Sequence, residues 1–484
     1  MPRLSWFMLL ALAACSDSSA NLTAGSGSTS SSSTETGSAP GPTTGESETG
    51  GAGSSTGTGS TTTTGQPTGD ETTTSDPSTG GMPTLEHFLL GMDVADVSPN
   101  PTFIAGKGVY MGAYGAPYTR GPAQGVHDPI YARSFAVEGN GGGLVMSIVD
   151  LPGMGNQITR EIRQQVAAKT GLSDAQILVS TTHSHSAPDF MGLWGGVPGG
   201  YREFLVTTVT NSMTAAWAER TPGTLRVATD KAPAGNRRGW GFTDDDMTVL
   251  DAFDLEQQRI GTVVVFAAHP VVLGEGNKLI SCDYPGYFVK DLEASLGAPV
   301  ALFNGTLGDA SPKVPDGDYA DDFARAEAYG QLLAGVAAEL TTLATEVEPE
   351  VELTHVEWVQ TVDNVLFKAA ALLGILLFDF EMDGLEQKVT TQATYFRLGR
   401  VIQGVAFPGE PLTRLGLAIK EHMQAPHKLI LGNTGDALGY FVPSDEWQTG
   451  KNDNYEETVS MGKTAGDNAR ERVTPLIDAG NANL

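Results

Sequence analysis

The chain has 484 residues, of which 18% are charged, and its formal net charge at pH 7 is −28. This acidic balance argues against binding to nucleic acid and against electrostatic docking on anionic lipid.

The first fifteen residues have the general design of a secretory signal: Arg3, a short apolar run, and the ending Leu-Ala-Ala-Cys at Cys15. That ending resembles a bacterial lipoprotein box, in which the cysteine is lipidated and becomes the mature N-terminus; the alternative is an ordinary signal peptide with an incidental cysteine. We expect an exported bacterial lipoprotein, periplasmic or on the cell surface, held at a membrane by a lipidated Cys15. Cys282 would then lack an internal partner, and the protein would have no disulfide.

Residues 16–84 consist mainly of Ser, Thr and Gly and contain no Lys or Arg. Such a segment cannot bury enough apolar surface to offset the entropy of ordering it, so we expect a disordered tether. No second linker follows. Residues 85–484 are therefore predicted to form one folded hydrolase domain.

Strands alternate with helices along this folded part. The predicted strands cover residues 88–99, 132–153 (a hairpin), 175–185, 260–270, 397–411 and 427–443. The predicted helices cover residues 156–171, 200–219 and 323–340. This order predicts an α/β fold: a mixed β-sheet core flanked by helices in a single large catalytic domain, with the active site at the strand ends.

Residues 365–380 form the most apolar stretch of the mature chain and are too short to span a bilayer. Two roles are open for this stretch. It could be a helix that lines an acyl channel or touches the membrane, or it could be an ordinary core helix.

Four residues suggest a metal site. His183 and His185 alternate at the end of a predicted strand, so both can face one cleft. His269 ends another apolar strand, and Glu410 lies on a Pro/Gly turn directly after a third. Nitrogen and oxygen ligands from separate strand ends, with one position left for water, are typical of catalytic zinc, although a hydrogen-bonded core pair of histidines is the alternative. The residues alone indicate a metal hydrolase of unspecified type.

The segment TTHSHSAP resembles the THTHSGP segment of the neutral/alkaline, non-lysosomal ceramidases. Further segments resemble motifs of that family in the same order: VHDPIYARSFAVEG, GNRRGWGFTDDDMTVLDAFD, VVVFAAHPVVLGEGNKLISCDYPGY, FNGTLGDASP, FPGEP and LGYFVPSDEW. On these residues the chain is identified as a member of the family, with its catalytic N-terminal domain only.

The resemblance implies a ligand set for one Zn2+ per chain. The metal ligands would be His183, His269, Glu410 and Tyr440. Tyr440 by itself would be taken for a half-buried aromatic residue. A second, structural Mg2+ or Ca2+ is also compatible with the resemblance.

The resemblance also implies three catalytic residues. His185 would hydrogen-bond the reacting amide or the water, Ser311 would belong to the active centre, and Arg237 would orient the substrate. Each has an alternative: Gly-Asp-Ala-Ser-Pro is a good turn sequence around Ser311, and Arg238 stands beside Arg237.

Three other residues could support the site. Asp150 and Asp283 end or follow strand-like runs and could orient a ligand. His127 could reach the cleft, but we favour a structural role for it.

The implied reaction is zinc-dependent hydrolysis of an N-acyl amide by metal-activated water, with ceramide cleaved to a sphingoid base and a fatty acid. Three departures affect the substrate: Lys313 and Trp447 replace an asparagine and a tyrosine of the family, and the chain stops 44 residues after Tyr440, where the family continues into a second domain. The alternatives are an amidase or esterase on another lipid-like substrate, and a non-catalytic surface lipoprotein that binds lipid or glycan.

Overall fold

The computed structural model describes residues 84–115, 118–384, 386–449 and 455–484, which belong to one compact unit. The predicted signal peptide of residues 1–15, with Cys15, lies outside the described residues, and so does the predicted tether apart from Thr84. Within the described part, none of the helices is both long and apolar enough to cross a membrane.

The core of the fold is a nine-stranded mixed sheet with the order β11-β9-β8-β6-β1-β3-β4-β5, and β13 pairs with β6 beside this path. Its strands are β1 (Phe88–Asp96), β3 (Tyr131–Gly139), β4 (Gly142–Val149), β5 (Ile177–Thr181), β6 (Thr221–Lys231), β8 (Asp246–Asp254), β9 (Arg259–Phe266), β11 (Val300–Asn304) and β13 (Thr345–Glu346). Both edge pairs, β4–β5 and β9–β11, are parallel. These strands read as continuous apolar runs because the sheet is covered on both faces.

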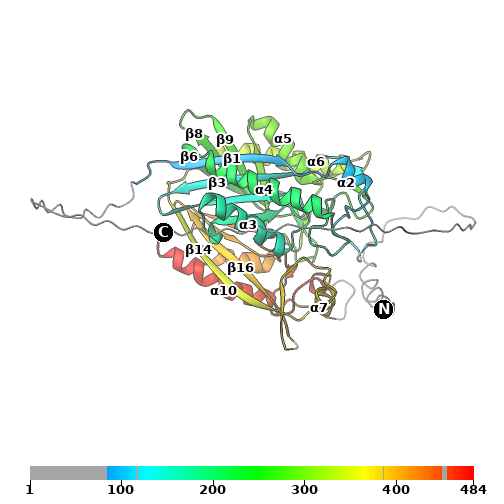
Figure 1. Ribbon diagram of the computed structural model, residues 1–484. Helices are drawn as coiled ribbons and strands as arrows, with labels where there is room; N and C mark the ends of the chain where they lie inside the picture. Colours follow the sequence, from blue (N-terminus) through cyan, green and yellow to red (C-terminus); the bar gives the residue numbers. More distant parts are fainter. Residues whose placement is uncertain (1–83, 116–117, 385, 450–454) are drawn as a thin grey trace, which may run out of the picture. The chain divides into compact units, whose positions relative to one another are not determined.

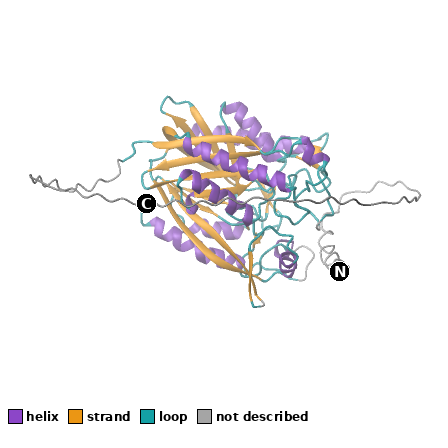
Figure 2. Ribbon diagram, viewed as in Figure 1, coloured by secondary structure: helices purple, strands orange, loops and turns teal. Residues whose placement is uncertain are grey.

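Four helices cover the outer face of this sheet (Figures 1 and 2). They are α3 (Asn156–Thr170), α4 (Gly199–Ala218), α5 (Tyr284–Leu296) and α6 (Asp322–Leu343). The amphipathic helix α3 ends where Gly171 adopts a left-handed conformation with φ 76°, which closes the last turn without strain on a side chain.

A five-stranded sheet packs against the inner face of the first sheet through a shared apolar cluster. Its strands are β14 (Val351–Val362), β15 (Phe380–Asp383), β16 (Glu386–Leu398), β17 (Ile402–Ala406) and β19 (His427–Leu431). The far face carries α8 (Thr413–His422) and α10 (Ala465–Asn481), the latter visible beneath β14 and β16 in Figure 1. The layers are therefore helix, sheet, sheet, helix, and the predicted mixed sheet flanked by helices is confirmed.

Short elements connect these layers around the ends of the strands. They are α2 (Pro101–Ala105), β2 (Gly125–Val126), the 3-10 turn Asp174–Gln176, β7 (Ala234–Asn236), β10 (Leu279–Ile280), β12 (Ala310–Pro312), α7 (Val365–Leu372), β18 (Glu410–Pro411), β20 (Tyr440–Phe441) and α9 (Tyr455–Thr458). Two of the short pairings place residues predicted for the site. β18 and β20 align Glu410 with Tyr440, and β12 and β7 align Ser311 with Gly235.

Two predicted elements differ from the structure. The strand predicted for residues 175–185 ends at Thr181, and His183 lies in the following loop with φ 66°. The argument that His183 and His185 share one face of a strand is therefore wrong, because the strand ends before either of them. The apolar stretch 365–380 is helical only in α7, after which the chain turns into β15.

The two edges of the nine-stranded sheet meet at one end. β11 and β5 are the two ends of the strand order. Nevertheless, the side-chain amide of Asn304, the last residue of β11, donates a hydrogen bond of 3.0 Å to the carbonyl of Thr182, which directly follows β5. The sheet must therefore bend until the ends of β5 and β11 come within reach of one side chain, and this brings the loops after β5 and β9 together.

Candidate metal centre

His183 is positioned by the loop that follows β4. Its backbone amide donates to the carbonyl of Leu151 at 2.9 Å, and its ring Nδ1 lies 2.5 Å from the carbonyl of Pro152. A carbonyl oxygen can only accept, so Nδ1 must carry the proton. In the neutral ring, which is the form that binds a metal, Nε2 is then the nitrogen with the free lone pair.

His269 is held in the same way by the segment between β11 and β12. Its backbone amide donates to the carbonyl of Ala310 at 3.1 Å. Its Nδ1 lies 2.7 Å from the carbonyl of Leu307 and 3.2 Å from that of Ala310. Nε2 is again unprotonated, and burial, followed by the charge of Arg237, lowers the pKa of His269 to about 4, so the ring is neutral at neutral pH.

Glu410 and Tyr440 reach the histidines from the side of the five-stranded sheet. Glu410 Oε2 lies 3.2 Å from Nε2 of His183 and 3.2 Å from Nε2 of His269. The Tyr440 hydroxyl lies 3.2 Å from Nε2 of His269. The structure thus brings together all four residues predicted as zinc ligands.

The donor atoms of this cluster fit a cation. With both Nδ1 atoms protonated, each Nε2 offers only a lone pair to Glu410, and Glu410 Oε2 has no hydrogen-bond partner within the described part of the chain. Acceptors that face one another in a buried site are unfavourable unless a cation lies between them. A tetrahedral zinc with bonds of about 2.0–2.1 Å would separate neighbouring ligand atoms by about 3.3 Å, close to the distances found here.

His185 lies against the same cluster. Its Nε2 is 3.1 Å from Nε2 of His183, and the ligand atoms of His183, His185 and His269 all lie within 4.8 Å of one another. These three histidines could hold a metal ion. The geometry therefore does not distinguish His185 from the ligands, and its assignment to the chemistry remains a prediction.

The surroundings of His185 were not predicted from the sequence. The edge of its ring packs on Tyr114 with centroids 4.8 Å apart, and its carbonyl accepts a hydrogen bond of 2.5 Å from the buried guanidinium of Arg120. Burial lowers the pKa of His185 well below its ordinary value, and the other two histidines lower it further. Its Nδ1 is buried without a hydrogen-bond partner among the described residues. A neutral ring with an unused nitrogen can exchange a hydrogen bond with a ligand.

Ser311 and Arg237 lie on the paired strands β12 and β7 or directly next to them. A Cβ at Gly235 would lie 2.7 Å from the Ser311 hydroxyl, so glycine at this position leaves room for the serine side chain. The backbone amide of Arg237 donates to the carbonyl of Asp309 at 2.9 Å. Ser311 directly follows Ala310, whose carbonyl holds His269, and it is half-buried.

The two neighbouring arginines have different surroundings. The guanidinium of Arg237 lies 5.2 Å from the ring centre of Tyr440, and its Nε is 2.7 Å from Glu456. Arg238 instead pairs with Glu456 and, at 2.9 Å, with Glu457, and is nearly buried. Arg237 is therefore the arginine that contacts a predicted ligand.

The two predicted supporting acids contact backbone or arginine groups. Asp150 pairs with Arg133 at 2.9 Å and accepts from a backbone amide of β3. Asp283 accepts from the amides of Val272 and Leu273, which fixes the loop after His269; burial raises its pKa to about 6. Support for the imidazoles comes from backbone carbonyls, which have no signature in the sequence.

The contacts of His127 are with residues outside the cluster. Its ring stacks on Phe323 with centroids 3.7 Å apart, and Nδ1 lies 3.0 Å from Asp128. These contacts agree with the structural role that we favoured for it.

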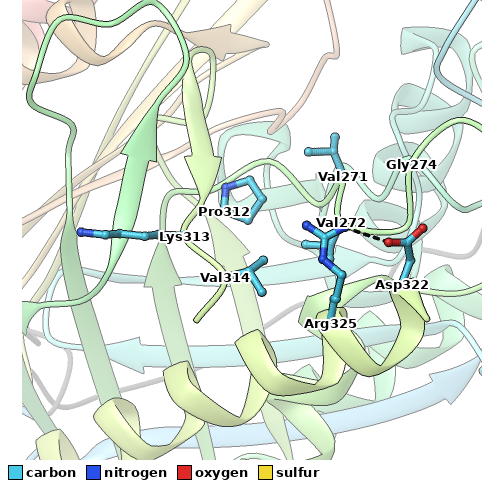
Figure 3. Close-up of a pocket in the computed structure, with 8 residues that line it drawn as sticks. All are labelled: Val271, Val272, Gly274, Pro312, Lys313, Val314, Asp322 and Arg325. Atoms are coloured by element: carbon cyan, nitrogen blue, oxygen red, sulfur yellow. Dashed lines mark hydrogen bonds and ion pairs between the residues drawn. The ribbon is translucent and has the colours of Figure 1, made fainter. Parts of the chain in front are cut away.

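A cavity of about 570 Å3 is lined by residues that closely follow His269 and Ser311 in the chain (Figure 3). The lining comes from the segment after His269, the segment after Ser311 and the start of α6. The lining residues are Val271, Val272, Gly274, Pro312, Lys313, Val314, Asp322 and Arg325. Asp322 and Arg325, one turn apart on α6, form an ion pair of 2.8 Å, whereas Lys313 points away from the other lining residues (Figure 3). The volume is in the range of small-molecule sites, and the lysine that departs from the family motif does not place its charge among the other lining groups.

The helix α7 is only partly a core helix. Phe367 and Ala370 are buried, but Val365 and Leu372 are 75% and 74% exposed, and Leu373 beside them is 51% exposed. Its N-terminal cap, Asn364, donates to the carbonyls of Thr458 and Ser460. Val459, which lies between these two residues, accepts a hydrogen bond from the backbone amide of Tyr440. The contact with lipid proposed for this stretch remains a prediction.

Several known proteins are similar to this chain in sequence or in fold. Residues 88–326 match the sequence profile described as "Neutral/alkaline non-lysosomal ceramidase, N-terminal". The chain is 25% identical over 264 residues to the neutral ceramidase of Drosophila melanogaster, which is 47% of this chain and 38% of that protein. It is 24% identical over 262 residues to that of Drosophila pseudoobscura pseudoobscura, which is 47% of this chain and 36% of that protein.

The fold is similar to that of a crystal structure of neutral ceramidase from Pseudomonas aeruginosa. The TM-score is 0.69 at 18% identity, with 82% of this chain and 75% of the other covered. A structure described as ceramidase complexed with C2 gives a TM-score of 0.68 at 17% identity and similar coverage.

Over residues 88–326 this chain matches the neutral/alkaline non-lysosomal ceramidase family, as the motifs predicted. The matched stretch contains His183, His185, His269 and Ser311, whereas Glu410 and Tyr440 lie beyond it. The chain covers less than two fifths of the length of the two fly relatives.

Proposed function

We propose that this protein is a zinc-dependent amidohydrolase that cleaves the amide bond of ceramide into a sphingoid base and a fatty acid. The observation that carries the proposal is the convergence of Glu410 Oε2 and two unprotonated Nε2 atoms at 3.2 Å in a buried site. The match of residues 88–326 to the ceramidase family supports the substrate class. Zinc held by His183, His269, Glu410 and Tyr440 would polarise the amide carbonyl and acidify a water molecule.

The side chains around the ligands have separate tasks in this reaction. His185 is neutral, so it can donate a hydrogen bond to the developing oxyanion, or accept the proton that the attacking water loses and pass it to the leaving amine. Burial raises the pKa of Tyr440 well above its ordinary value, whereas Arg237, which lies over the ring, lowers it and so favours the phenolate form that binds a metal. The carbonyls of Pro152 and Leu307 keep the two ligand rings in the required tautomer.

Ser311 orients the amide or the water in this proposal. A nucleophilic serine needs a base within hydrogen-bond reach. In the described part of the chain no side chain hydrogen-bonds to the Ser311 hydroxyl, and Nδ1 of the nearby His269 already donates to carbonyls. This arrangement supports an orienting role over a nucleophilic one.

The test is metal analysis followed by an activity screen. We expect the purified chain to contain one zinc per molecule, to lose activity with a chelator and to recover it when zinc is restored. Fluorescent ceramide should be hydrolysed faster than N-acyl amino acids or esters of the same chain length. Zinc without ceramide turnover would favour an amidase or esterase on another lipid-like substrate, and absence of zinc would favour a lipid- or glycan-binding surface protein.

We also propose that the protein is an exported lipoprotein anchored through Cys15. The support is the sequence alone, since Cys15 lies outside the described residues. Metabolic labelling with a palmitate analogue should label the wild-type protein and not Cys15→Ser. Equal labelling of both would contradict the anchor.

A further inference from the structure

Asn304 is a buried amide whose hydrogen bonds join the two histidine segments. Its Nδ2 donates to the carbonyl of Thr182 at 3.0 Å and to the carbonyl of Ala268 at 3.2 Å. Its Oδ1 accepts from the backbone amide of Ala268 at 3.3 Å. Thr182 directly precedes His183, and Ala268 directly precedes His269. One side chain therefore spans the two backbones that carry the predicted nitrogen ligands.

These contacts require a carboxamide in one orientation. Two carbonyl oxygens need two donors, and a backbone amide needs an acceptor, so the nitrogen of Asn304 must face Thr182 O and Ala268 O. An aspartate would keep the acceptor but place an oxygen against two carbonyls. Asn304 is only 4% exposed, so water cannot readily replace the hydrogen bonds that such a substitution would remove.

The backbone of Asn304 extends the connection to the oxygen ligands. Its carbonyl accepts from the amide of Gly432 at 2.9 Å. Asn433, the residue after Gly432, donates from its backbone amide to the carbonyl of Gly409 at 2.8 Å, directly before Glu410. The segments that carry three of the four predicted ligands therefore meet at Asn304 and its bonded neighbour.

We propose that Asn304 is a positioning residue for the metal centre, and that its amide sets the separation between His183 and His269. The inference rests on the proposed zinc site. Asn304 contacts the backbone next to each of the two histidines and none of the ligand atoms. Its effect is therefore on the distance between the ligand atoms, both without and with a bound metal. Without this amide the segments that follow β5 and β9 would lose the side chain that joins them, and the two Nε2 atoms would no longer converge.

The test compares Asn304→Ala and Asn304→Asp with the wild-type chain by metal binding. Zinc affinity is measured by competition with a chromogenic chelator, and geometry by the visible absorption of the Co2+-substituted protein. We expect both variants to bind zinc about 10–100-fold more weakly, the usual effect of residues that orient ligands, and to show an altered Co2+ spectrum.

Gln403→Ala is the matched control. Gln403 is another fully buried amide, on β17, with Nε2 donating to Tyr395 and Asn481 and Oε1 accepting from two backbone amides. Its loss should lower the melting temperature of the metal-free protein as Asn304→Ala does, but leave zinc affinity and the Co2+ spectrum unchanged. A role of Asn304 in the fold alone would make the two variants behave alike.

Each outcome decides the proposal. Wild-type zinc affinity and Co2+ spectrum in a folded Asn304 variant would overturn the inference and leave the zinc site standing. A wild-type chain that binds no metal would overturn the zinc site and the inference together. Failure of both Asn304 variants to fold, while Gln403→Ala folds, would assign Asn304 to the fold and overturn the positioning role.

Discussion

The candidate metal centre has two sides that are built differently. The nitrogen side consists of His183 and His269, which lie in loops at the end of the nine-stranded sheet and have each Nδ1 bonded to backbone carbonyls. The oxygen side consists of Glu410 and Tyr440, which lie opposite each other on the two-residue strands β18 and β20. The nitrogen side lies within the stretch that matches the ceramidase family, and the oxygen side lies outside it.

This difference shows that the site depends on the packing of two sheets. The nitrogen side is oriented by its own sheet, since the carbonyls and Asn304 come from loops at the ends of its strands. The oxygen side follows β17 and β19 of the second sheet, which packs on the first through an apolar cluster. Neither side has enough ligands for a closed zinc site, so zinc binding reports on the assembled domain.

The largest expected effect is on the nitrogen side. His183→Ala removes one ligand, and we expect loss of stoichiometric zinc and a fall in amide hydrolysis on the order of 10³-fold or more, because the metal supplies several kcal/mol of transition-state stabilisation. His127→Ala is the control, because that ring stacks on Phe323. Full zinc content in His183→Ala would remove His183 from the ligand set.

On the oxygen side, Glu410→Gln should affect the metal-free and the zinc-loaded protein in opposite directions. The carboxamide can donate a hydrogen bond to an unprotonated Nε2, so we expect the metal-free protein to gain about 1 kcal/mol of unfolding free energy. The same change should weaken zinc binding roughly 100-fold, since it removes a charged ligand. Urea unfolding with chelator and with added zinc measures both effects. A loss of stability in both forms would contradict the acceptor-only description of the site.

The effect of Ser311→Ala should be smaller and independent of the metal. We expect unchanged zinc content and hydrolysis reduced about 10–100-fold, the cost of losing one hydrogen bond to a charged transition state. Rapid quenching and mass spectrometry of the wild-type chain with ceramide check the chemistry. An acyl group found on Ser311 would replace the orienting role by a nucleophilic one.

The smallest effect on the chemistry is expected at α7, which is tied to the oxygen side through Asn364. Replacement of Leu372 and Leu373 by Ser should leave hydrolysis of a water-soluble short-chain amide unchanged and weaken binding to neutral vesicles about 100-fold or more, because each inserted leucine contributes about 1.5–3 kcal/mol. Phe367→Ser, at a buried position of the same helix, is the comparison and should lower stability instead. Equal vesicle binding by the leucine variant would leave α7 as a partly exposed core helix.

Much of the fold and of the candidate site could be predicted from local sequence. The helix 156–171 has its apolar spacing and closing glycine in the chain itself, and it appears as α3. The residues predicted as ligands all come to one place in the structure. They could be named from the sequence because they belong to motifs whose order could be compared with a family. Tyr440 could be found only by that resemblance, since a tyrosine in an apolar segment looks like a core residue.

The rest depended on contacts between distant segments. The sequence by itself determined the residue types of the site and the alternation of strands and helices, because periodicity and turn residues act locally. Three features were decided only by the tertiary structure. The strand before His183 ends at Thr181, and the ends of β5 and β11, the two edge strands of the nine-stranded sheet, meet. The carbonyls of Pro152 and Leu307 fix the tautomers of the two imidazoles. The physical reason is that backbone carbonyls are the same at every residue, so which of them faces a histidine is set by the packing of the whole domain.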